Sequence, residues 1–315
     1  MIEAHDLSKV FGTVRALDSV TVSARRGTVL ALLGHNGAGK TTLVNILTAS
    51  LPPTSGRATV AGLDVVRQPR EIRQRIGLTG QFASVDGRLS ARDNLVLLAR
   101  LLGADRRAAH ARADELLELF ALREVATRRA GTYSGGLRRR LDLAASLVGR
   151  PEVIFLDEPT TGLDPSSRLG LWEIVEGLVA EGTTVVLTTQ YLEEADRLAD
   201  SIVVLAAGSV IAGGTAAELK ARVGRRTVTV ALDDTDDPRA AVAALRRSGL
   251  EPVTSPADGT ITVPIDASRE MARVVRALDH VGIEAAELAF AEPSLDDVYL
   301  NLAAQPTPSS GGPVR

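Results

Sequence analysis

The motif GHNGAGKT at residues 34–41 is the strongest indicator of fold in this 315-residue chain. It fits the pattern G-x-x-x-x-G-K-[ST]. It follows the apolar run GTVLALLG, which is typical of a buried strand, and it leads into the helical segment TTLVNILTAS. A glycine-rich turn between a buried strand and a helix begins an α/β unit, so we expect a largely parallel sheet covered by helices.

The same turn is a candidate phosphate-binding site, because small residues let backbone N–H groups point at phosphate oxygens and the helix N-terminus adds positive potential. Lys40 would reach the β- and γ-phosphates of a nucleotide, and the Thr41 hydroxyl would hold Mg²⁺. A turn without a ligand is the alternative, but Lys40 is one of only three lysines in the chain. The expected binding set is Gly34, His35, Asn36, Gly37, Ala38, Gly39, Lys40, Thr41 and Thr42.

A second motif, VIFLDEP at residues 153–159, places two carboxylates at the end of a buried strand. The carboxyl ends of the strands are where open α/β sheets bind their ligands. Asp157 is expected to hold Mg²⁺ through water, and Glu158 to act as the general base that polarises an attacking water. Two surface carboxylates without a ligand are the alternative, which the accompanying phosphate-binding turn argues against.

The pattern along the chain indicates two domains and a tail. Residues 1–222 alternate strands with helices and contain a helical insertion at about 85–150. Residues 223–303 follow the order βαββαβ of a small α+β domain, if EPVTS is a short edge strand. Residues 304–315, which include QPTPSSGGPVR, have the composition of a disordered tail.

The composition excludes several classes of function. Aromatic residues make up 3% and the net charge is −3, which argues against a nucleic-acid partner. The chain has no cysteine, so disulfides and thiolate metal sites are excluded. The N-terminus carries Glu3 and Asp6 where a signal peptide would be apolar, and no apolar run reaches the ~18 residues that span a bilayer. We therefore expect a cytosolic chain that reaches a membrane only through a partner.

Further motifs give the sequence a specific resemblance. YSGGLRRR at residues 133–140, in which Ser134 precedes Asp157 by 23 residues, resembles the signature motif of ATP-binding cassette (ABC) proteins. Gln81, GLDP at residues 162–165 and Phe11 match the Q-loop, the D-loop and the adenine-stacking position of that family. The resemblance covers about 220 residues. It implies a P-loop NTPase cassette, with a mostly parallel sheet, an antiparallel β subdomain and a helical insertion, followed by the small α+β domain.

The resemblance also implies that the nucleotide site is shared between two copies of the chain. Ser134, Gly135 and Gly136 would bind the ATP of a second copy in a head-to-tail dimer, and Gln81 would be a further Mg²⁺ ligand. These three residues begin a helix whose exposed N–H groups suit an anion, although a simple helix cap is the alternative. Ser134 would then stabilise the transition state from the opposite copy.

At one position the sequence departs from the family. The switch residue that follows TTVVLTT is usually histidine, and here it is Gln190. Glutamine can donate a hydrogen bond to the γ-phosphate but cannot carry a charge or shuttle a proton. In one interpretation, Glu158 remains the base and Gln190 only positions the γ-phosphate, so that hydrolysis is slow but competent. In the other, the site binds ATP and hardly turns it over.

A narrower resemblance concerns TTQYLEEAD and the C-terminal PSLDDVYLNL, which are similar to ATP-binding subunits of the daunorubicin/doxorubicin-resistance type. It implies an ATPase that uses ATP and Mg²⁺ to drive efflux of a hydrophobic drug or antibiotic. The implied partners are an integral membrane permease subunit, at the cytoplasmic face of the membrane, and a second copy. A non-transport regulatory ATPase acting as a nucleotide-gated binding module stays open, as does an import ATPase. The C-terminal domain is either a regulatory appendage or a folding or dimerisation module.

Overall fold

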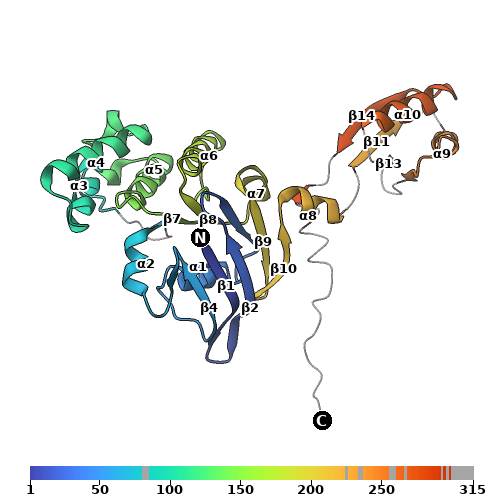
Figure 1. The fold of residues 1–315 in the computed structure, drawn as a ribbon. Coiled ribbons are helices and arrows are strands. Elements are labelled where there is room, and N and C mark those ends of the chain that lie inside the picture. The colour runs from blue at the N-terminus through green and yellow to red at the C-terminus, as the bar shows by residue number, and fades with distance from the viewer. Residues whose placement is uncertain are drawn as a thin grey trace, which may run out of the picture. The chain divides into compact units, whose positions relative to one another are not determined.

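The computed structural model describes residues 1–79, 85–223, 226–232, 237–254, 260–265 and 268–291, together with 294, 295 and 298. The chain divides into two compact units, Met1–Ala216 and Ala217–Arg315, and each has its own hydrophobic core (Figure 1). Gln81, at the predicted Q-loop position, and the predicted tail at 304–315 lie outside the described residues.

The first unit contains a six-stranded sheet. Its strands are β3 (Val29–Leu33), β6 (Ile76–Thr79), β7 (Val153–Asp157), β8 (Thr184–Thr189), β9 (Ser201–Ala206) and β10 (Ser209–Gly214). They lie in the order β10-β9-β3-β8-β7-β6, and all neighbours are parallel except β9 and β10. Every residue of β3, β7 and β8 is buried, as their continuous apolar runs require. The predicted mostly parallel sheet is confirmed.

A second, antiparallel sheet lies in the same unit. It consists of β1 (Ile2–Phe11), β2 (Val14–Ala24), β4 (Ser55–Val60) and β5 (Leu63–Asp64), in the order β2-β1-β4-β5. Its buried side chains form one core with strands β3 and β7 and with helix α1 (Lys40–Leu47). The predicted antiparallel β subdomain is confirmed, and the core it shares with α1 fixes the turn that precedes this helix.

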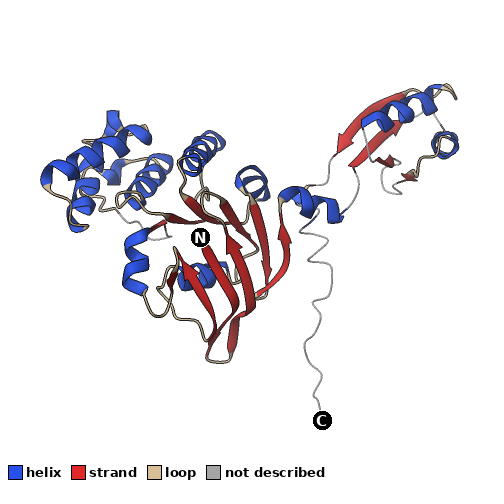
Figure 2. Cartoon of the chain, in the orientation of Figure 1, coloured by secondary structure: helices blue, strands red, loops and turns tan. Residues whose placement is uncertain are grey.

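The remaining helices of the first unit include the predicted insertion. They are α2 (Pro69–Arg75), α3 (Ala91–Leu101), α4 (Arg106–Leu119), η1 (Arg123–Val125), η2 (Ala130–Thr132), α5 (Gly135–Ser146), α6 (Pro165–Ala180) and α7 (Leu192–Leu198). Helices α3, α4 and α5 gather at one side of the unit, drawn in green in Figure 1 and as three helices without strands in Figure 2. Side-chain caps begin α3 and α4: Ser90 Oγ accepts from the Asp93 N–H, and Asp105 from the Ala108 N–H.

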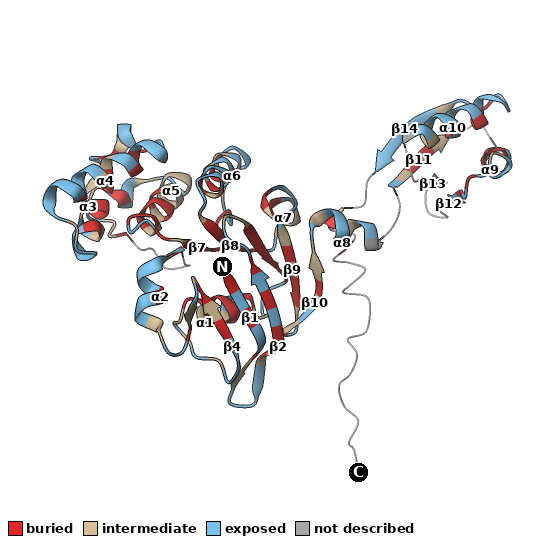
Figure 3. Cartoon of the chain, in the orientation of Figure 1, coloured by how far each residue is buried: buried red, intermediate tan, exposed pale blue. Residues whose placement is uncertain are grey.

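The second unit is a sheet with two helices on one face. It contains α8 (Ala216–Val223), which begins at the boundary, then β11 (Arg226–Leu232), α9 (Pro238–Arg247), β12 (Val253–Thr254), β13 (Ile261–Ile265), α10 (Ser268–Asp279) and β14 (Ala285–Ala291). The sheet order is β12-β13-β11-β14, with antiparallel neighbours. This is the predicted βαββαβ order, including a short edge strand. The core of this unit consists of buried side chains of β11, α9, β13 and α10 and of the turns that follow the helices (Figure 3).

Candidate active site

The turn between β3 and α1 depends on its glycines. Gly39 has φ 105° and caps α1 without a side chain. A Cβ on it would lie 2.8 Å from Leu17 Cδ2, and a Cβ on Gly34 would lie 2.4 Å from the Leu205 carbonyl oxygen. Gly37 has φ 84°, but a Cβ there would meet no heavy atom within 4 Å. The two ends of the turn are therefore held against neighbouring backbone while its middle stays open, as a phosphate-binding loop requires.

Lys40 is the first residue of α1, and its side chain turns back over the loop. Its exposed fraction is 5%. Nζ donates to the carbonyl oxygens of Gly34 at 2.6 Å and His35 at 3.3 Å, and it lies 3.7 Å from Glu158 Oε1. The structure therefore brings together the cation of the first motif and a carboxylate of the second, which are 118 positions apart in sequence.

A threonine of the neighbouring strand holds the carboxylate of Asp157 and the backbone of Glu158 at the end of β7. Thr188 of β8 stands opposite Asp157 in the parallel register. Its hydroxyl donates to Asp157 Oδ1 at 2.5 Å and accepts from the Glu158 N–H at 3.0 Å. Glu158 itself has φ 46°, a left-handed conformation that costs a non-glycine residue roughly 1–2 kcal/mol. This strain is offset by the Thr188 contacts, and it occurs at the position where a catalytic base is expected.

Arg139 ties the helix of the signature motif to the same strand end. Its Nη2 donates to the Asp157 carbonyl oxygen at 2.9 Å, and its Nε to the Pro159 carbonyl oxygen at 2.7 Å. Burial lowers the pKa of Arg139, against the influence of the nearby Asp142 and Asp157 carboxylates. Neither Arg139 nor Thr188 was among the residues predicted for the site. The first lies inside the quoted motif YSGGLRRR, and the second could have been found only from the pairing of β7 with β8.

The signature residues form an exposed helix start. Ser134 caps α5, with its Oγ accepting from the Leu137 N–H at 3.4 Å, and both Ser134 and Gly135 are exposed. Gly136 is closer to its surroundings, because a Cβ there would lie 2.8 Å from Ser167 Oγ. Figure 1 shows α5 among the insertion helices, away from α1. Among the described residues, the polar contacts of Lys40 are with Gly34, His35 and Glu158 and do not include the signature residues 134–136 of the same chain.

The D-loop sequence GLDP leads into α6 through a strong cap. Asp164 accepts hydrogen bonds from the hydroxyls of Ser166 and Ser167 at 2.6 Å each and from the Ser167 N–H at 2.9 Å. These bonds hold the pKa of Asp164 well below its usual range. Ser167 thus connects the cap of α6 with Gly136 of the signature helix, so the two motifs support each other.

Two further residues that were predicted to contact the nucleotide are exposed. Phe11 ends β1 with an exposed fraction of 48%, and the ammonium of Lys9 lies 5.1 Å from the centre of its ring. Gln190 directly follows β8 and is exposed, and its side chain makes no hydrogen bond with the residues that the structure describes. The conformation after it is set by Thr189, whose Oγ1 accepts from the Tyr191 N–H at 2.9 Å.

Comparisons with known proteins agree with this geometry. A family profile described as ABC transporter matches residues 17–161. The chain is 52% identical to the daunorubicin resistance ATP-binding protein DrrA3 of Streptomyces coeruleorubidus, over 96% of this chain and 95% of that protein. It is 47% identical to the doxorubicin resistance ATP-binding protein DrrA of Mycobacterium tuberculosis, over 95% and 91%. A solved dimeric bacterial ABC transporter cassette, MJ0796, superposes with a TM-score of 0.63 at 25% identity, covering 68% of this chain and 98% of that one.

The chain belongs to the ABC transporter family and is an ATPase of the kind that is coupled to transport. Within that family, the predicted resemblance to the daunorubicin/doxorubicin-resistance ATP-binding proteins is confirmed over nearly the whole length of the sequence. Among the described residues, no helix combines the length and the apolar composition needed to cross a bilayer.

Proposed function

We propose that this chain is the ATP-hydrolysing subunit of an exporter that drives efflux of a hydrophobic drug or antibiotic through a separate membrane subunit. The observation that carries the proposal is the identity of 52% over 96% of the chain with a drug-resistance ATP-binding protein. That identity extends beyond the cassette into the second unit, which a general ABC ATPase would not need to share. We assign residues 1–222 to the nucleotide-binding domain, 223–303 to an accessory domain and 304–315 to a tail.

ATP would lie with its phosphates in the turn at 34–41 and its adenine on Phe11. Lys40 would exchange its contacts with the Gly34 and His35 carbonyls for β- and γ-phosphate oxygens. Glu158 lies 3.7 Å from that ammonium, so its carboxylate is next to the place where the γ-phosphate would end. From there Glu158 would accept the proton of the attacking water. Catalysis would otherwise be positioning and charge stabilisation.

One residue of α1 and one at the end of β7 have the chemistry that a Mg²⁺ ion requires. Thr41 and Asp157 offer a hydroxyl and a carboxylate, and oxygen donors are what Mg²⁺ prefers. Oδ1 of Asp157 is held by Thr188, while Oδ2 accepts no hydrogen bond from a described residue. We propose Thr41, Asp157 and Gln81 as the residues that would hold the ion. A bound Mg²⁺ would supply charge neutralisation at the phosphate oxygens.

The second half of the site would come from another copy. Ser134, Gly135 and Gly136 present the N-terminus of α5 on the surface, which suits the γ-phosphate of a facing chain. A head-to-tail pair would enclose two ATP molecules between phosphate loops and signature helices. Gln190 would position the γ-phosphate, and Glu158 would remain the base.

The insertion offers a place for the membrane subunit, at the cytoplasmic face of the membrane. A groove of about 960 Å³ lies at the end of α3 and the start of α4. Leu101 and Leu102 at this groove have exposed fractions of 73% and 62%. Two adjacent leucines with such large exposed fractions indicate a contact site rather than core. An apolar segment of the permease would cover them.

Purification of the chain from gently solubilised native membranes tests the proposal. We expect a polytopic membrane protein to co-purify in near-equal amount, and to be lost with a Leu101→Asp, Leu102→Asp double variant. A Leu119→Asp variant, which changes an exposed leucine away from the groove, serves as the matched control. If the chain is instead recovered alone or with nucleic acid, the ATPase stands but the transport role is wrong and the regulatory alternative applies.

A further inference from the structure

Helices α9 and α10 of the second unit carry most of the positive charge of residues 223–315. Residues 223–315 contain 9 arginines against 14 aspartates and glutamates, a net charge of −5. Six of those arginines nevertheless lie on α9 and α10, which cover one face of the sheet. They are Arg239, Arg246, Arg247, Arg269, Arg273 and Arg276. The positive charge of this acidic domain is therefore concentrated on its two sheet-covering helices.

Between these helices lies a cavity of about 390 Å³ that is lined by basic side chains. Arg247 and Ser248 enter it from the end of α9, and Arg273, Arg276 and His280 from α10 and the turn after it. No aspartate or glutamate of the described residues lines it. Its volume is in the range of small-molecule sites. The cavity therefore combines three guanidinium groups, an imidazole and a hydroxyl without a carboxylate in its wall.

Contacts within the unit compensate little of this charge. Arg273 Nη1 lies 3.8 Å from Glu270 Oε1, in a partly exposed pair. Arg247 Nε donates to the Ala243 carbonyl oxygen at 3.3 Å, which neutralises no charge. Within the described residues, Arg276 forms no ion pair with a carboxylate. Among the described residues, Arg247 and Arg276 therefore pair with no carboxylate, and their exposed guanidinium groups are available to an anion at the cavity.

Helix-end stabilisation accounts for only part of the arrangement. Arg247 and Arg276 stand in the last turns of α9 and α10, where cations favour the helix dipole. Arg273 lies before the last turn of α10, and His280 lies beyond the end of this helix. Stabilisation of the helix dipole therefore does not explain the positions of these two residues. The convergence of all four side chains on one cavity is a separate feature.

We propose that this cavity binds a phosphate group, carried either by a free phosphate compound or by the headgroup of an anionic lipid. Guanidinium groups form forked, charge-assisted hydrogen bonds with phosphate oxygens, and Arg247 and Arg276 are placed to do so from two different helices. The Ser248 hydroxyl adds a neutral donor. This site lies in the accessory domain and does not depend on the proposed transport role.

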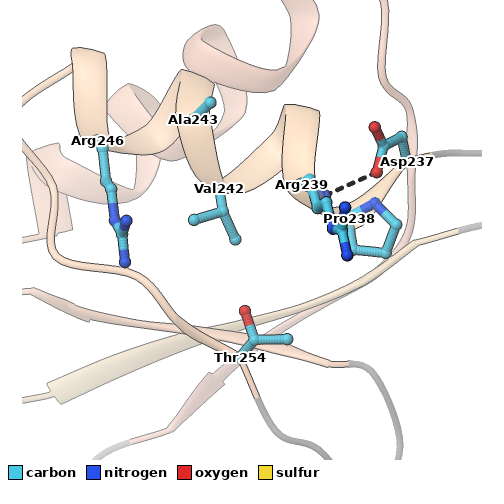
Figure 4. A pocket seen from close by; sticks show the side chains of 7 residues that line it. All are labelled: Asp237, Pro238, Arg239, Val242, Ala243, Arg246 and Thr254. Carbon is cyan, nitrogen blue, oxygen red and sulfur yellow. Dashed lines mark hydrogen bonds between the residues drawn. The ribbon is translucent and has the colours of Figure 1, made fainter.

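The opposite side of α9 provides a matched control. A cavity of about 740 Å³ lies there, between α9 and β12. Figure 4 shows Val242 and Thr254 facing each other across it, with Arg239 and Arg246 towards its two ends and Asp237 beside Arg239. Its floor is apolar and its wall includes a carboxylate. Removing Arg239 and Arg246 therefore removes the same charge from the same helical layer while leaving the proposed phosphate site intact.

The test uses the full chain with its cassette site saturated by a non-hydrolysable ATP analogue. One arm adds inorganic phosphate and follows amide hydrogen exchange in α9 and α10. The other measures co-sedimentation with phosphatidylcholine vesicles that do or do not contain phosphatidylglycerol. The variants are Arg247→Gln with Arg276→Gln, the control pair Arg239→Gln with Arg246→Gln, and Arg247→Lys with Arg276→Lys, which keeps the charge. The substituted arginines are exposed, so all variants should fold.

We expect at least one probe to bind the wild type and to bind the Arg247, Arg276 glutamine pair at least about tenfold more weakly, the usual cost of losing a hydrogen bond to a charged group. The control pair should bind like wild type, and the lysine pair should recover part of the loss. Protection by phosphate alone identifies a free ligand, and vesicle binding alone a lipid headgroup. Equal losses in the glutamine pair and the control pair, or no binding of either probe, overturn the proposal.

Discussion

The phosphate-loop side and the signature side of the nucleotide site differ in how much of each one chain completes. Lys40 and Asp157 have exposed fractions of 5% and 8% and are held by contacts within the chain. Ser134 and Gly135 are exposed, and the polar contacts of Lys40 within the described residues do not include them. The phosphate-loop side is buried and held by its own chain, so it can bind ATP in a single copy. The signature side is exposed and needs the facing surface of a second copy. This difference separates ATP binding, which one chain can perform, from ATP hydrolysis, which requires the assembled pair.

Removing Lys40 should have the largest effect. A Lys40→Ala variant loses the only lysine at the loop and leaves Glu158 without its counter-charge, so we expect ATP turnover to fall by more than about a thousandfold. Lys220→Ala removes a lysine outside the site and is the control. Normal turnover in Lys40→Ala would contradict the assignment of the loop.

Mixing two inactive variants tests directly whether the two sides of the site come from different copies. A Cβ on Gly135 would meet nothing within 4 Å in its own chain, so Gly135→Asp should fold and harm only a facing phosphate. Each of Lys40→Ala and Gly135→Asp should be inactive alone. An equal mixture should recover up to about a quarter of wild-type turnover, because half of the pairs are mixed and each has one intact site. No recovery, with pairing verified by cross-linking, would argue against a site shared between copies.

Substitution of the proposed base should separate binding from chemistry within the buried half. Glu158→Gln keeps the shape of the side chain and its backbone contacts with Thr188 but cannot accept a proton. We expect turnover to fall by about a hundredfold or more, with ATP binding retained. Turnover measured beside nucleotide affinity checks this, and Glu152→Gln, on the surface of the same segment, is the control. Wild-type turnover in Glu158→Gln would show that another group is the base.

How much of this site the sequence predicts depends on whether the signal is local. The turn at 34–41 and the strand end at 153–159 were identifiable because each motif carries its own strand, turn and residue types. Thr188 was missed, since only the parallel register of β7 and β8 puts it opposite Asp157. Arg139 was missed because its partners are backbone carbonyl groups 18 and 20 positions away, which no side-chain pattern reveals.

The same distinction holds for the rest of the fold. Most strands and helices of both units followed from hydrophobic periodicity, but the short elements β5 (Leu63–Asp64) and α2 (Pro69–Arg75) were not predicted, and the two-residue edge strand β12 (Val253–Thr254) was expected only on the condition that EPVTS forms a strand. The sequence order does not reveal that Glu194 is completely buried, because it lies in the charged run LEEADRL of α7. Its carboxylate accepts a hydrogen bond from Trp172 Nε1 at 3.0 Å, a contact between two helices that only the packed structure defines.

Glu194 should make stability depend on pH. Burial raises its pKa above the ordinary value of 4.5, against the hydrogen bonds from Thr189 and Trp172. The folded state therefore holds the proton more tightly, so the stability from this group is present at low pH and is lost as pH rises from about 4.5 through the raised pKa. The Glu194→Gln variant should show a weaker dependence of stability on pH. Its free energy of unfolding at pH 8 should be about 1 kcal/mol higher than that of the wild type.

Denaturant unfolding between pH 5 and pH 8.5 checks this expectation. Glu193→Gln is the matched control, since Glu193 is the exposed neighbour with 74% of its side chain accessible. If both variants keep the wild-type slope, the buried carboxyl is not the cause. Because α7 begins two residues after Gln190, this contact also bears on how firmly the switch segment is held.

Substitution of Gln190 should have the smallest effect on ATP turnover. It tests the contribution of the switch position to the site. Its side chain is exposed and makes no hydrogen bond with a described residue, so a substitution should leave the fold unchanged. Gln190→His would add a group that can carry a charge, and we expect turnover to rise by only a few-fold if Glu158 is the base. Gln190→Ala should lower it by a similar factor, through lost positioning. A rise of about a hundredfold in Gln190→His would mean that the natural site binds ATP and hardly hydrolyses it, and the pH profile of turnover would then follow the histidine.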